Sequence, residues 1–534
     1  MKRYIITAMI ILSATLGFSQ DYIDAIRYSQ TNYGGTARSI SMGSAFGALG
    51  ADFSSASINP AGLGLYRNGE FVFSPTLNIN NITSSYLNTN TKDTKYNFNF
   101  NNLSYVSSFK TGVESGIVNI TLGFGYNRIK NFHSNFVVSG HGAQTTLLDY
   151  YTSYANSIGD SEYFDEFHEG MAWKTYLVDA DPDPEVIEGV FYNELADYSK
   201  YEIYDGNNNF MGYGYSKSGV KSHSQKSIVE QSGRIDEYLI SLGMNIDYKL
   251  YVGASFGLLD LEFEENNIFT EIDDENKCAY FKDYNLASRQ QHSGFGMNFK
   301  AGLIYRPFKS LRLGAAIHTP NFFSISNYQE KDMEANYDLP LGNDTDGYHN
   351  TWESKDVTES YRFKLETPLK TVLSAAYLFG ERGLLSVDYE IIGYSSTKFR
   401  AAAGDNWDYS GQNEILSNTF KTTGNLHVGG EFRLSENFSL RGGFELFGNP
   451  YNKTVSFGST NIDLANNKDY LRSYSAGFGY RQQKFFLDFA YRMMDSKQAY
   501  SVHEMIAGDI NYGSNIAQLA GINSQATMTV GFRF

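Results

Sequence analysis

The sequence predicts an all-β protein, a 14-stranded antiparallel transmembrane β-barrel with an N-terminal plug inside its lumen. Three observations lead to this fold class. Aromatic residues make up 16% of the 534 residues and glycine contributes another 50 residues, a composition that suits strands and turns. Segments with a period of two recur along the chain, and the connections between them are alternately short and long.

The first residues carry an export signal. Lys2 and Arg3 precede an apolar stretch over residues 4–16, and Gly17 and Ser19 supply small residues at positions −3 and −1 of the expected cleavage site. This pattern is typical of a secretory signal peptide, and we expect residues 1–19 to be removed by cleavage. The sequence contains no other apolar run long enough for a transmembrane helix. An exported chain of this kind is either soluble or a barrel, since a closed sheet also pairs its backbone polar groups within lipid.

Alternation along the chain favours the barrel. Between residues 117 and 128, apolar side chains alternate with Gly, Asn and Thr, and residues 238–247 repeat the pattern. The last strand, ending at Phe534, shows it again. A soluble β-sandwich can produce one such segment, whereas a long series that ends on a C-terminal Phe favours a membrane barrel. The candidate strands lie near residues 70–80, 97–109, 116–139, 234–248, 250–264, 292–305, 311–325, 369–379, 384–400, 421–433, 438–448, 470–480, 484–494 and 525–534.

The connections between these strands carry an independent signal, because they sort by length. The short ones lie at residues 110–115, 249–250, 306–310, 380–383, 435–437 and 481–483. The long ones lie at residues 81–96, 140–233, 265–291, 326–368, 401–420, 449–469 and 495–524. Short turns on one side and long loops on the other are typical of outer membrane barrels, and an even strand count puts both ends on one side. The longest connection is large enough to hold a small subdomain.

Composition excludes several classes of function. Asp and Glu number 59 against 43 Lys and Arg, so the formal net charge is −16, which argues against a nucleic acid partner. The single cysteine, Cys278, excludes a disulfide framework and a cysteine-rich metal site. Gly253 to Gly257 match the G-x-S-x-G nucleophile pattern, but they lie within an alternating strand and not at a strand-to-helix elbow. We expect no enzyme activity, no cofactor and no metal.

The segment ahead of the first strand differs from the rest. Residues 20–69 are rich in Gly, Ala and Ser and show no alternation. A wall of fourteen strands encloses a lumen too wide for its own side chains to fill. We therefore expect residues 20–69 to pack inside the barrel, which the domain from residue 70 to residue 534 forms.

Three motifs in this segment carry a family resemblance: Gly-Thr-Ala-Arg at 35–38, Met-Gly-Ser-Ala-Phe at 42–46, and Ser-Ile-Asn-Pro-Ala-Gly-Leu at 57–63. Together they resemble the plug of the FadL/TodX family of outer membrane channels for long-chain fatty acids and aromatic hydrocarbons. In that family an Asn-Pro-Ala motif closes an N-terminal hatch, and the matching positions here are Asn59, Pro60 and Ala61, with Gly62 after them. An ordinary turn is the alternative interpretation of these four residues. A strand running out to Thr319-Pro320 resembles a second family element.

The resemblance implies a channel for passive uptake of hydrophobic compounds such as long-chain fatty acids, with lateral release into the membrane. Such a channel needs apolar side chains that face inward near the outer loops. The candidate ligand-binding residues are Phe322, Phe323 and Ile325, which break the alternation just beyond Pro320. An aromatic girdle at the membrane interface, or loop packing, is the alternative interpretation of these side chains.

The expected partners are hydrophobic small molecules or lipids, within an outer membrane faced with lipopolysaccharide. Two other functions stay open from the sequence. One is a protein-interaction component with the same barrel fold, such as a type IX secretion shuttle, with the loop 140–233 as its partner surface. The other is a surface receptor that uses the large loops. The sequence names no protein partner.

Overall fold

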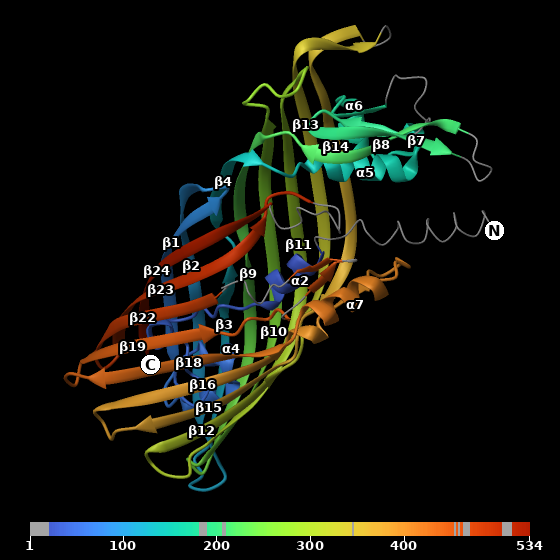
Figure 1. Ribbon diagram of the computed structural model, residues 1–534. Helices are drawn as coiled ribbons and strands as arrows, with labels where there is room; N and C mark the ends of the chain where they lie inside the picture. Colours follow the sequence, from blue (N-terminus) through green and yellow to red (C-terminus); the bar gives the residue numbers. More distant parts are fainter. Residues whose placement is uncertain are drawn as a thin grey trace.

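The computed structural model describes residues 21–180, 190–204, 210–343, 347–452, 455–457, 460–462, 470–504 and 515–534. The expected signal peptide, residues 1–19, lies outside the described residues. The chain forms a closed antiparallel barrel of fourteen strands (Figure 1), and pairing of its first and last strands closes the wall. The predicted barrel is therefore confirmed. Within the described residues, no helix has both the length and the apolar character needed to cross a membrane.

Each strand of the wall pairs antiparallel with its neighbours. Some wall strands consist of two successive elements, which are joined here by a plus sign. In order around the barrel the wall contains β1 (Glu70–Tyr86), β2 (Thr89–Lys110), β3 (Ile117–Asn131) + β4 (Ser134–Ala143), β9 (His223–Ile246), β10 (Leu250–Ile272), β11 (Phe281–Tyr305), β12 (Leu311–His318) + β13 (Phe322–Asn343), β14 (Gly347–Glu366) + β15 (Lys370–Leu378), β16 (Gly383–Gly393) + β17 (Lys398–Ala401), β18 (Thr422–Arg433), β19 (Phe438–Phe447), β22 (Tyr470–Arg481), β23 (Phe485–Ser501) and β24 (Ile516–Arg533).

Two neighbouring wall strands are interrupted at a proline. β12 and β13 are separated by Thr319–Asn321, which includes Pro320, and β14 and β15 are separated around Pro368. Proline has no N–H to give to a ladder, so an interruption is expected there. On one side of these breaks β12 pairs with β15, and on the other side β13 pairs with β14. The predicted strands 311–325 and 384–400 are each two elements, the second of them divided by η3 (Tyr394–Ser396).

The short connections all lie where predicted, but much of the predicted outer loops is strand. β1 and β2 meet in a tight turn at Leu87 and Asn88, and β13 and β14 continue as a long hairpin that projects at the top of Figure 1. The interpretation of residues 81–96, 265–291 and 326–368 as loops was wrong in this respect. Beyond the lipid the outward face of these strands meets water and becomes polar, while the inner face packs against the subdomain at residues such as Phe269, Phe281 and Met333, and the backbone ladder continues.

The connection 140–233 holds a small subdomain, as its length suggested. Thr146 caps the helix α5 (Leu147–Ile158) by accepting a hydrogen bond from the Leu148 amide, and Gly159 ends it with a φ of 76°. The apolar core of the subdomain continues into the outer ends of β4, β10 and β11. Its elements are α5 (Leu147–Ile158), η2 (Ser161–Tyr163), α6 (Glu169–Lys174), β5 (Val178–Ala180), β6 (Phe191–Asn193), β7 (Ala196–Tyr204) and β8 (Phe210–Val220). Elsewhere outside the wall lie α7 (Ser410–Thr419), β20 (Val455–Phe457) and β21 (Thr460–Ile462).

Large apolar side chains cover the outside of the wall. Phe71, Phe124, Ile240, Leu313 and Phe478 are between 42% and 55% exposed, although each lies in a regular strand. Their neighbours along the chain, which face the lumen, are mostly small or polar. This apolar exterior is typical of a barrel surrounded by lipid.

Candidate functional site

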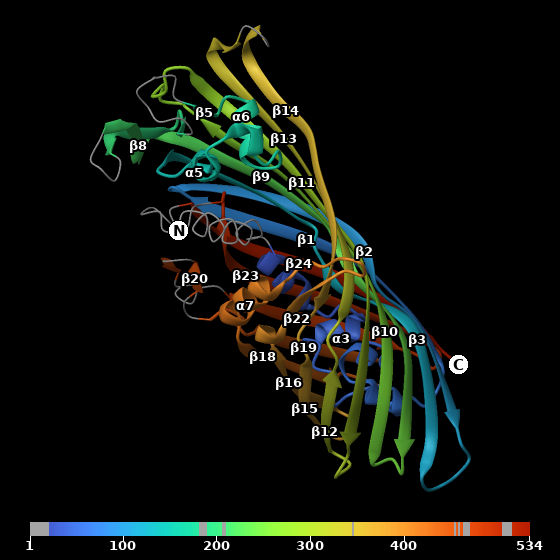
Figure 2. The same ribbon diagram turned by 90° about the vertical axis from the view of Figure 1, so that its right-hand side faces the viewer.

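The N-terminal segment occupies the barrel lumen. It contains α2 (Asp21–Ser29), α3 (Ala37–Ser41), α4 (Ser55–Ile58) and the 3-10 helix η1 (Pro60–Leu65). Between residues 33 and 64 every residue except Ala51 is buried. The helices contact strands from opposite parts of the wall, α3 against β19 and β22–β24 and η1 against β9–β11. Figure 2 shows them, in blue, enclosed by the strands.

Glycines on the inner face of the wall make room for this segment. A Cβ atom at Gly443 would lie 2.1 Å from the Gly43 nitrogen, and one at Gly429 would lie 2.1 Å from the Met42 oxygen. At Gly253 it would lie 2.3 Å from the backbone oxygen of Pro60. No side chain fits at these positions without moving backbone atoms. The glycines that alternate along the strands are therefore contact points for the N-terminal segment.

The Asn-Pro-Ala-Gly motif begins η1 and joins it to the wall. The Asn59 side-chain oxygen accepts a hydrogen bond from the Ala61 amide at 3.1 Å, which caps the helix, and Pro60 follows at the first helical position. The Asn59 amide group donates to the Gly47 oxygen at 2.6 Å and to the Leu303 oxygen of β11 at 3.1 Å. Gly62 packs against Ser55, because a Cβ there would lie 2.7 Å from the serine Cβ.

Buried charges fix the segment to the other side of the lumen. The Arg38 guanidinium lies 3.1 Å from the Glu431 carboxylate, and Arg441 lies 2.7 Å from the same carboxylate and 2.6 Å from Asp488. Arg492 donates to the backbone oxygen of Tyr33 at 3.1 Å. Removing one partner of such a pair leaves a buried charge uncompensated, which costs about 3–5 kcal/mol.

A buried apolar cluster lies above these contacts, and we refer to it as the lumen cluster. Helix α2 contributes side chains to it, and the remaining members come from β3 and its connection to β4, from β9, β10, β13, β14, β16, η3 and β17, and from the region around α7. Its buried members are Ala25, Ile26, Tyr28, Ile129, Phe132, Ile235, Leu259, Leu261, Phe263, Phe323, Ile325, Phe363, Leu365, Ile392, Tyr394, Phe399, Tyr409, Leu416 and Phe420.

Polar groups of α2 border the lumen cluster. The Tyr28 hydroxyl and His292 Nδ1 are 2.5 Å apart, and His292 Nε2 lies 3.8 Å from Asp24. Arg27 lies 4.1 Å above the ring of Phe263. Burial, and then the Asp24 carboxylate, raise the pKa of Tyr28, so its hydroxyl stays protonated and can donate to His292. An apolar surface bordered by a few donors can hold an amphipathic small molecule.

The structure separates the three candidate ligand residues. Phe323 and Ile325 belong to the lumen cluster and are 2% and 1% exposed, whereas Phe322 is 46% exposed and faces outward with the lipid-facing side chains. Sequence reasoning missed other aromatic members of the cluster, such as Phe263 and Phe399. The alternation of Leu259, Leu261 and Phe263 was visible in the sequence, but it did not reveal which face of the strand meets the lumen.

The ladder between β2 and β3 is incomplete beside the lumen cluster. It runs from Lys110 to Asn102 and no further. Beyond it the carbonyl oxygens of Arg128 and Ile129 accept hydrogen bonds from the amides of Gly34 and Asn32, each at 3.0 Å. Backbone of the N-terminal segment therefore takes the place of β2 along this part of β3. We call this interruption the seam.

Side-chain contacts bridge the seam. The Asn131 amide group of β3 donates to the Asn97 side chain of β2 at 3.1 Å. Gly34 is required for the close approach on the lumen side, since a Cβ there would lie 2.4 Å from the Arg128 oxygen. The wall is thus held together here without a backbone ladder.

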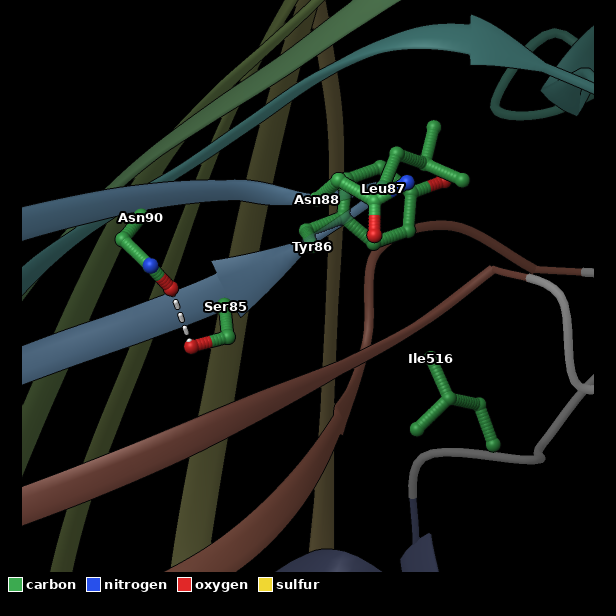
Figure 3. A pocket seen from close by; sticks show the side chains of 6 residues that line it. All are labelled: Ser85, Tyr86, Leu87, Asn88, Asn90 and Ile516. Carbon is green, nitrogen blue, oxygen red and sulfur yellow. Dashed lines mark hydrogen bonds between the residues drawn. The ribbon is translucent and has the colours of Figure 1, made fainter.

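The detected surface depressions lie away from the lumen cluster. One, of about 410 Å³, surrounds the turn between β1 and β2, where Tyr86, Leu87 and Asn88 lie near Ile516 (Figure 3). Another lies at the short turn between β22 and β23. Neither is lined by a member of the lumen cluster, and we assign no site to them. Within the described residues, no group of three or more His, Cys, Asp or Glu side chains is placed to hold a metal ion.

Comparison with known proteins identifies the fold. No protein-family model and no curated protein matches the sequence. Among solved structures, a Pseudomonas aeruginosa FadL homologue matches with a TM-score of 0.52 and 11% identity, over 94% of this chain and 99% of that chain. The Pseudomonas putida toluene transporter TodX matches at 0.47 and 13% identity, over 95% and 100% of the chains. The Ralstonia pickettii toluene transporter TbuX matches at 0.44 and 13%, over 94% and 98%. The barrel is similar to that of the FadL homologue, as the motifs of the N-terminal segment predicted.

Proposed function

We propose that the chain is an outer membrane channel for the passive uptake of hydrophobic small molecules, and that residues 20–69 are its plug. One observation carries this proposal: a buried apolar cluster lies within the barrel, bordered by the N-terminal segment and next to an interruption of the wall. The fold similarity to the FadL homologue supports the channel architecture. Two of the similar structures are named toluene transporters, and toluene is a hydrophobic molecule.

The substrate replaces side chains that now fill the lumen cluster. Tyr28 on α2 and Leu416 on α7 lie on short helices rather than on the wall, so we propose that they yield to the ligand. A ligand that buries about 300 Å² of apolar surface gains about 7 kcal/mol, less the cost of moving these groups. The Arg27 guanidinium, which is paired with Asp24, lies over Phe263 at the border of the cluster, and a cation in that position suits a carboxylate. Long-chain fatty acids fit both features.

The seam is the proposed lateral exit. A closed ladder gives an apolar molecule no route through the wall, and the backbone ladder stops at Asn102, where the seam begins. The carbonyl oxygens that β2 leaves free on β3 are bonded instead to Asn32 and Gly34 of the plug. We propose that withdrawal of the plug backbone around Asn32 and Gly34 opens the route from the lumen cluster into the membrane.

Native mass spectrometry of protein purified from its own membrane tests the substrate proposal. We expect a retained fatty acid or hydrocarbon on the unaltered chain and its loss from Phe323→Ala, which shortens a buried member of the lumen cluster. The control is Phe322→Ala, the neighbouring residue that faces outward, and it should keep the ligand. Retention by both variants, or a retained ligand that is hydrophilic, contradicts the proposed site.

A cross-link across the seam tests lateral release. Cysteines at Asn97 and Asn131, whose side chains meet across the seam, would be joined by a short thiol-specific cross-linker in a Cys278→Ser background. We expect the cross-linked protein to bind a radiolabelled fatty acid but to transfer less of it to liposomes. The same double variant without cross-linker is the control. Equal transfer with and without the cross-link would exclude the seam as the exit.

A further inference from the structure

The subdomain in the connection 140–233 carries an exposed aromatic hairpin. β7 and β8 pair with each other in a two-stranded sheet, and the sheet projects away from the barrel in both views (Figures 1 and 2). Tyr201, Tyr204, Phe210 and Met211 are 50%, 48%, 51% and 60% exposed. Among the described residues, neither strand pairs with any other strand.

These side chains lie far outside the lipid-facing surface. On β9 the exposed apolar residues end at Tyr238, and the same face continues outward with Asp236, Arg234 and other polar residues. The strand then runs to His223, where the hairpin connection joins it. At about 3.3 Å per residue, His223 lies about 50 Å from Tyr238 along the strand. At the usual tilt of barrel strands this is about 35–40 Å along the membrane normal. Contact with lipid does not explain the exposed rings.

The rings form an ordered row on one face of the hairpin. The ring centroids of Tyr204 and Phe210 are 5.9 Å apart, and those of Phe210 and Tyr213 are 5.1 Å apart. The Lys200 ammonium lies 4.2 Å from the centroid of the Tyr213 ring. This row therefore needs little ordering before it binds, and preorganised aromatic side chains lose little conformational entropy in an interface.

The opposite face of the hairpin carries Ile203 and Tyr201, which pack over Gly214, and the Tyr201 ring is itself half exposed. A Cβ at Gly214 would lie 2.9 Å from Ile203 Cδ1 and 3.1 Å from the ring of Tyr201. The hairpin is fixed to the subdomain at its base, where the Lys217 ammonium lies 2.7 Å from the Asp149 carboxylate. An isolated two-stranded sheet is only marginally stable in water. A partner that adds a strand to the sheet, or packs on one of its faces, therefore stabilises the hairpin.

The charge of the surrounding subdomain selects the kind of partner. Residues 147–221 contain fifteen Asp and Glu residues against four Lys. Lipopolysaccharide is anionic and is repelled by such a surface, whereas a basic polypeptide is attracted to it. Within the part of the chain that the structure describes, the outer edges of β7 and β8 pair with no other strand, so they offer backbone donors and acceptors to an extended chain. Exposed apolar side chains that gather on one surface within a polar rim are typical of a protein interaction site.

We propose that the β7–β8 hairpin docks a positively charged protein segment outside the membrane, through the row of Tyr204, Phe210 and Tyr213. The partner lies in extended conformation against a free strand edge and packs an apolar side chain on the row. Its basic side chains face the acidic subdomain. This interaction is independent of what the barrel transports.

Binding to defined peptides tests the proposal on the full-length protein in detergent. The probe is a fluorescent peptide of alternating Lys and Tyr, and the comparison ligands are a Glu/Tyr peptide of equal length and purified lipopolysaccharide. We expect the Lys/Tyr peptide to bind, and its affinity to fall as salt is added. Its affinity for the triple variant Tyr204→Ser/Phe210→Ser/Tyr213→Ser should be at least about tenfold lower. Tyr163→Ser, which removes a 72% exposed ring elsewhere in the subdomain, should change the affinity less than about twofold.

Hydrogen exchange gives a second measurement that does not depend on a variant. Bound Lys/Tyr peptide should slow exchange of the β7 or β8 amides, because the unpaired edge becomes hydrogen-bonded. Equal affinity of the triple variant, equal binding of the Glu/Tyr peptide, tighter binding of lipopolysaccharide, or unchanged exchange in both strands would each overturn the proposal.

Discussion

Two adjacent glycines in β19 offer a matched pair of substitutions on opposite faces of the wall. A Cβ at Gly443 would meet the Gly43 nitrogen at 2.1 Å and the Met42 carbonyl carbon at 2.4 Å, whereas a Cβ at Gly442 would find its nearest atom at 3.9 Å. Real Cβ contacts of this kind are not shorter than 3.0 Å, so Gly443→Ala must push the plug backbone away by about 1 Å.

Overpacking of this kind costs about 1–3 kcal/mol. The hydrogen-bonded barrel wall is stiffer than the N-terminal segment, so we expect the segment to move. The ratio of molecules with the segment bound in the lumen to molecules with it displaced should fall by about 5- to 150-fold. Planar bilayer recordings of Gly443→Ala should therefore show frequent openings. Limited proteolysis should cut the N-terminal segment faster than in the unaltered chain.

Gly442→Ala is the control, because it adds the same methyl group to the same strand on the outer face. It should conduct and resist proteolysis as the unaltered chain does. Both proteins are first shown to be folded by circular dichroism and by their migration in unheated gels. If the two variants behave alike, the inner glycines are not contact points for a plug and the reasoning fails.

Three further results are expected. Phe323→Ala should lower the free energy of unfolding by about 3–5 kcal/mol in denaturant titrations, because a ring buried in the lumen cluster is lost, while Phe322→Ala should cost less than about 1 kcal/mol. Glu431→Gln should destabilise the seating of the plug by about 3–5 kcal/mol, measured as faster hydrogen exchange around Arg38, because that guanidinium loses its buried partner. Combining it with Arg38→Met should slow exchange again in part, because Arg441 loses the same carboxylate but keeps Asp488, and additive effects of the two changes would contradict the pairing.

The barrel could be predicted from sequence because lipid on one side and a filled lumen on the other impose a period of two on every strand. Outside the lipid the outward face no longer has to be apolar, so the extension of β13 keeps only a short alternation, at Met333, Ala335 and Tyr337, which was interpreted as loop. The phase of alternation is also lost at Pro320. Odd-numbered residues such as Leu313 face outward before the interruption, and odd-numbered Phe323 faces inward after it. This reversal is why Phe322 and Phe323 could not be told apart.

The contacts that hold the N-terminal segment were not predictable in the same way. Arg38 and Glu431 are brought together only by the register of the whole barrel, and no local pattern relates residues so far apart in the chain. Asn59 was found because its motif resembles a known plug. Its cap on η1 follows from local chemistry, whereas its bond to Leu303 follows from where the helix lies in the lumen.

Conductance of a chain that lacks residues 21–65 but keeps its export signal tests the plugged channel most directly. The deletion removes the four helices of the N-terminal segment and leaves the barrel strands intact. A folded barrel without them should show large, long-lived open currents in planar bilayers, where the full chain stays closed. Currents from the shortened barrel that are as small as those of the full chain would show that something other than its N-terminal segment closes the lumen.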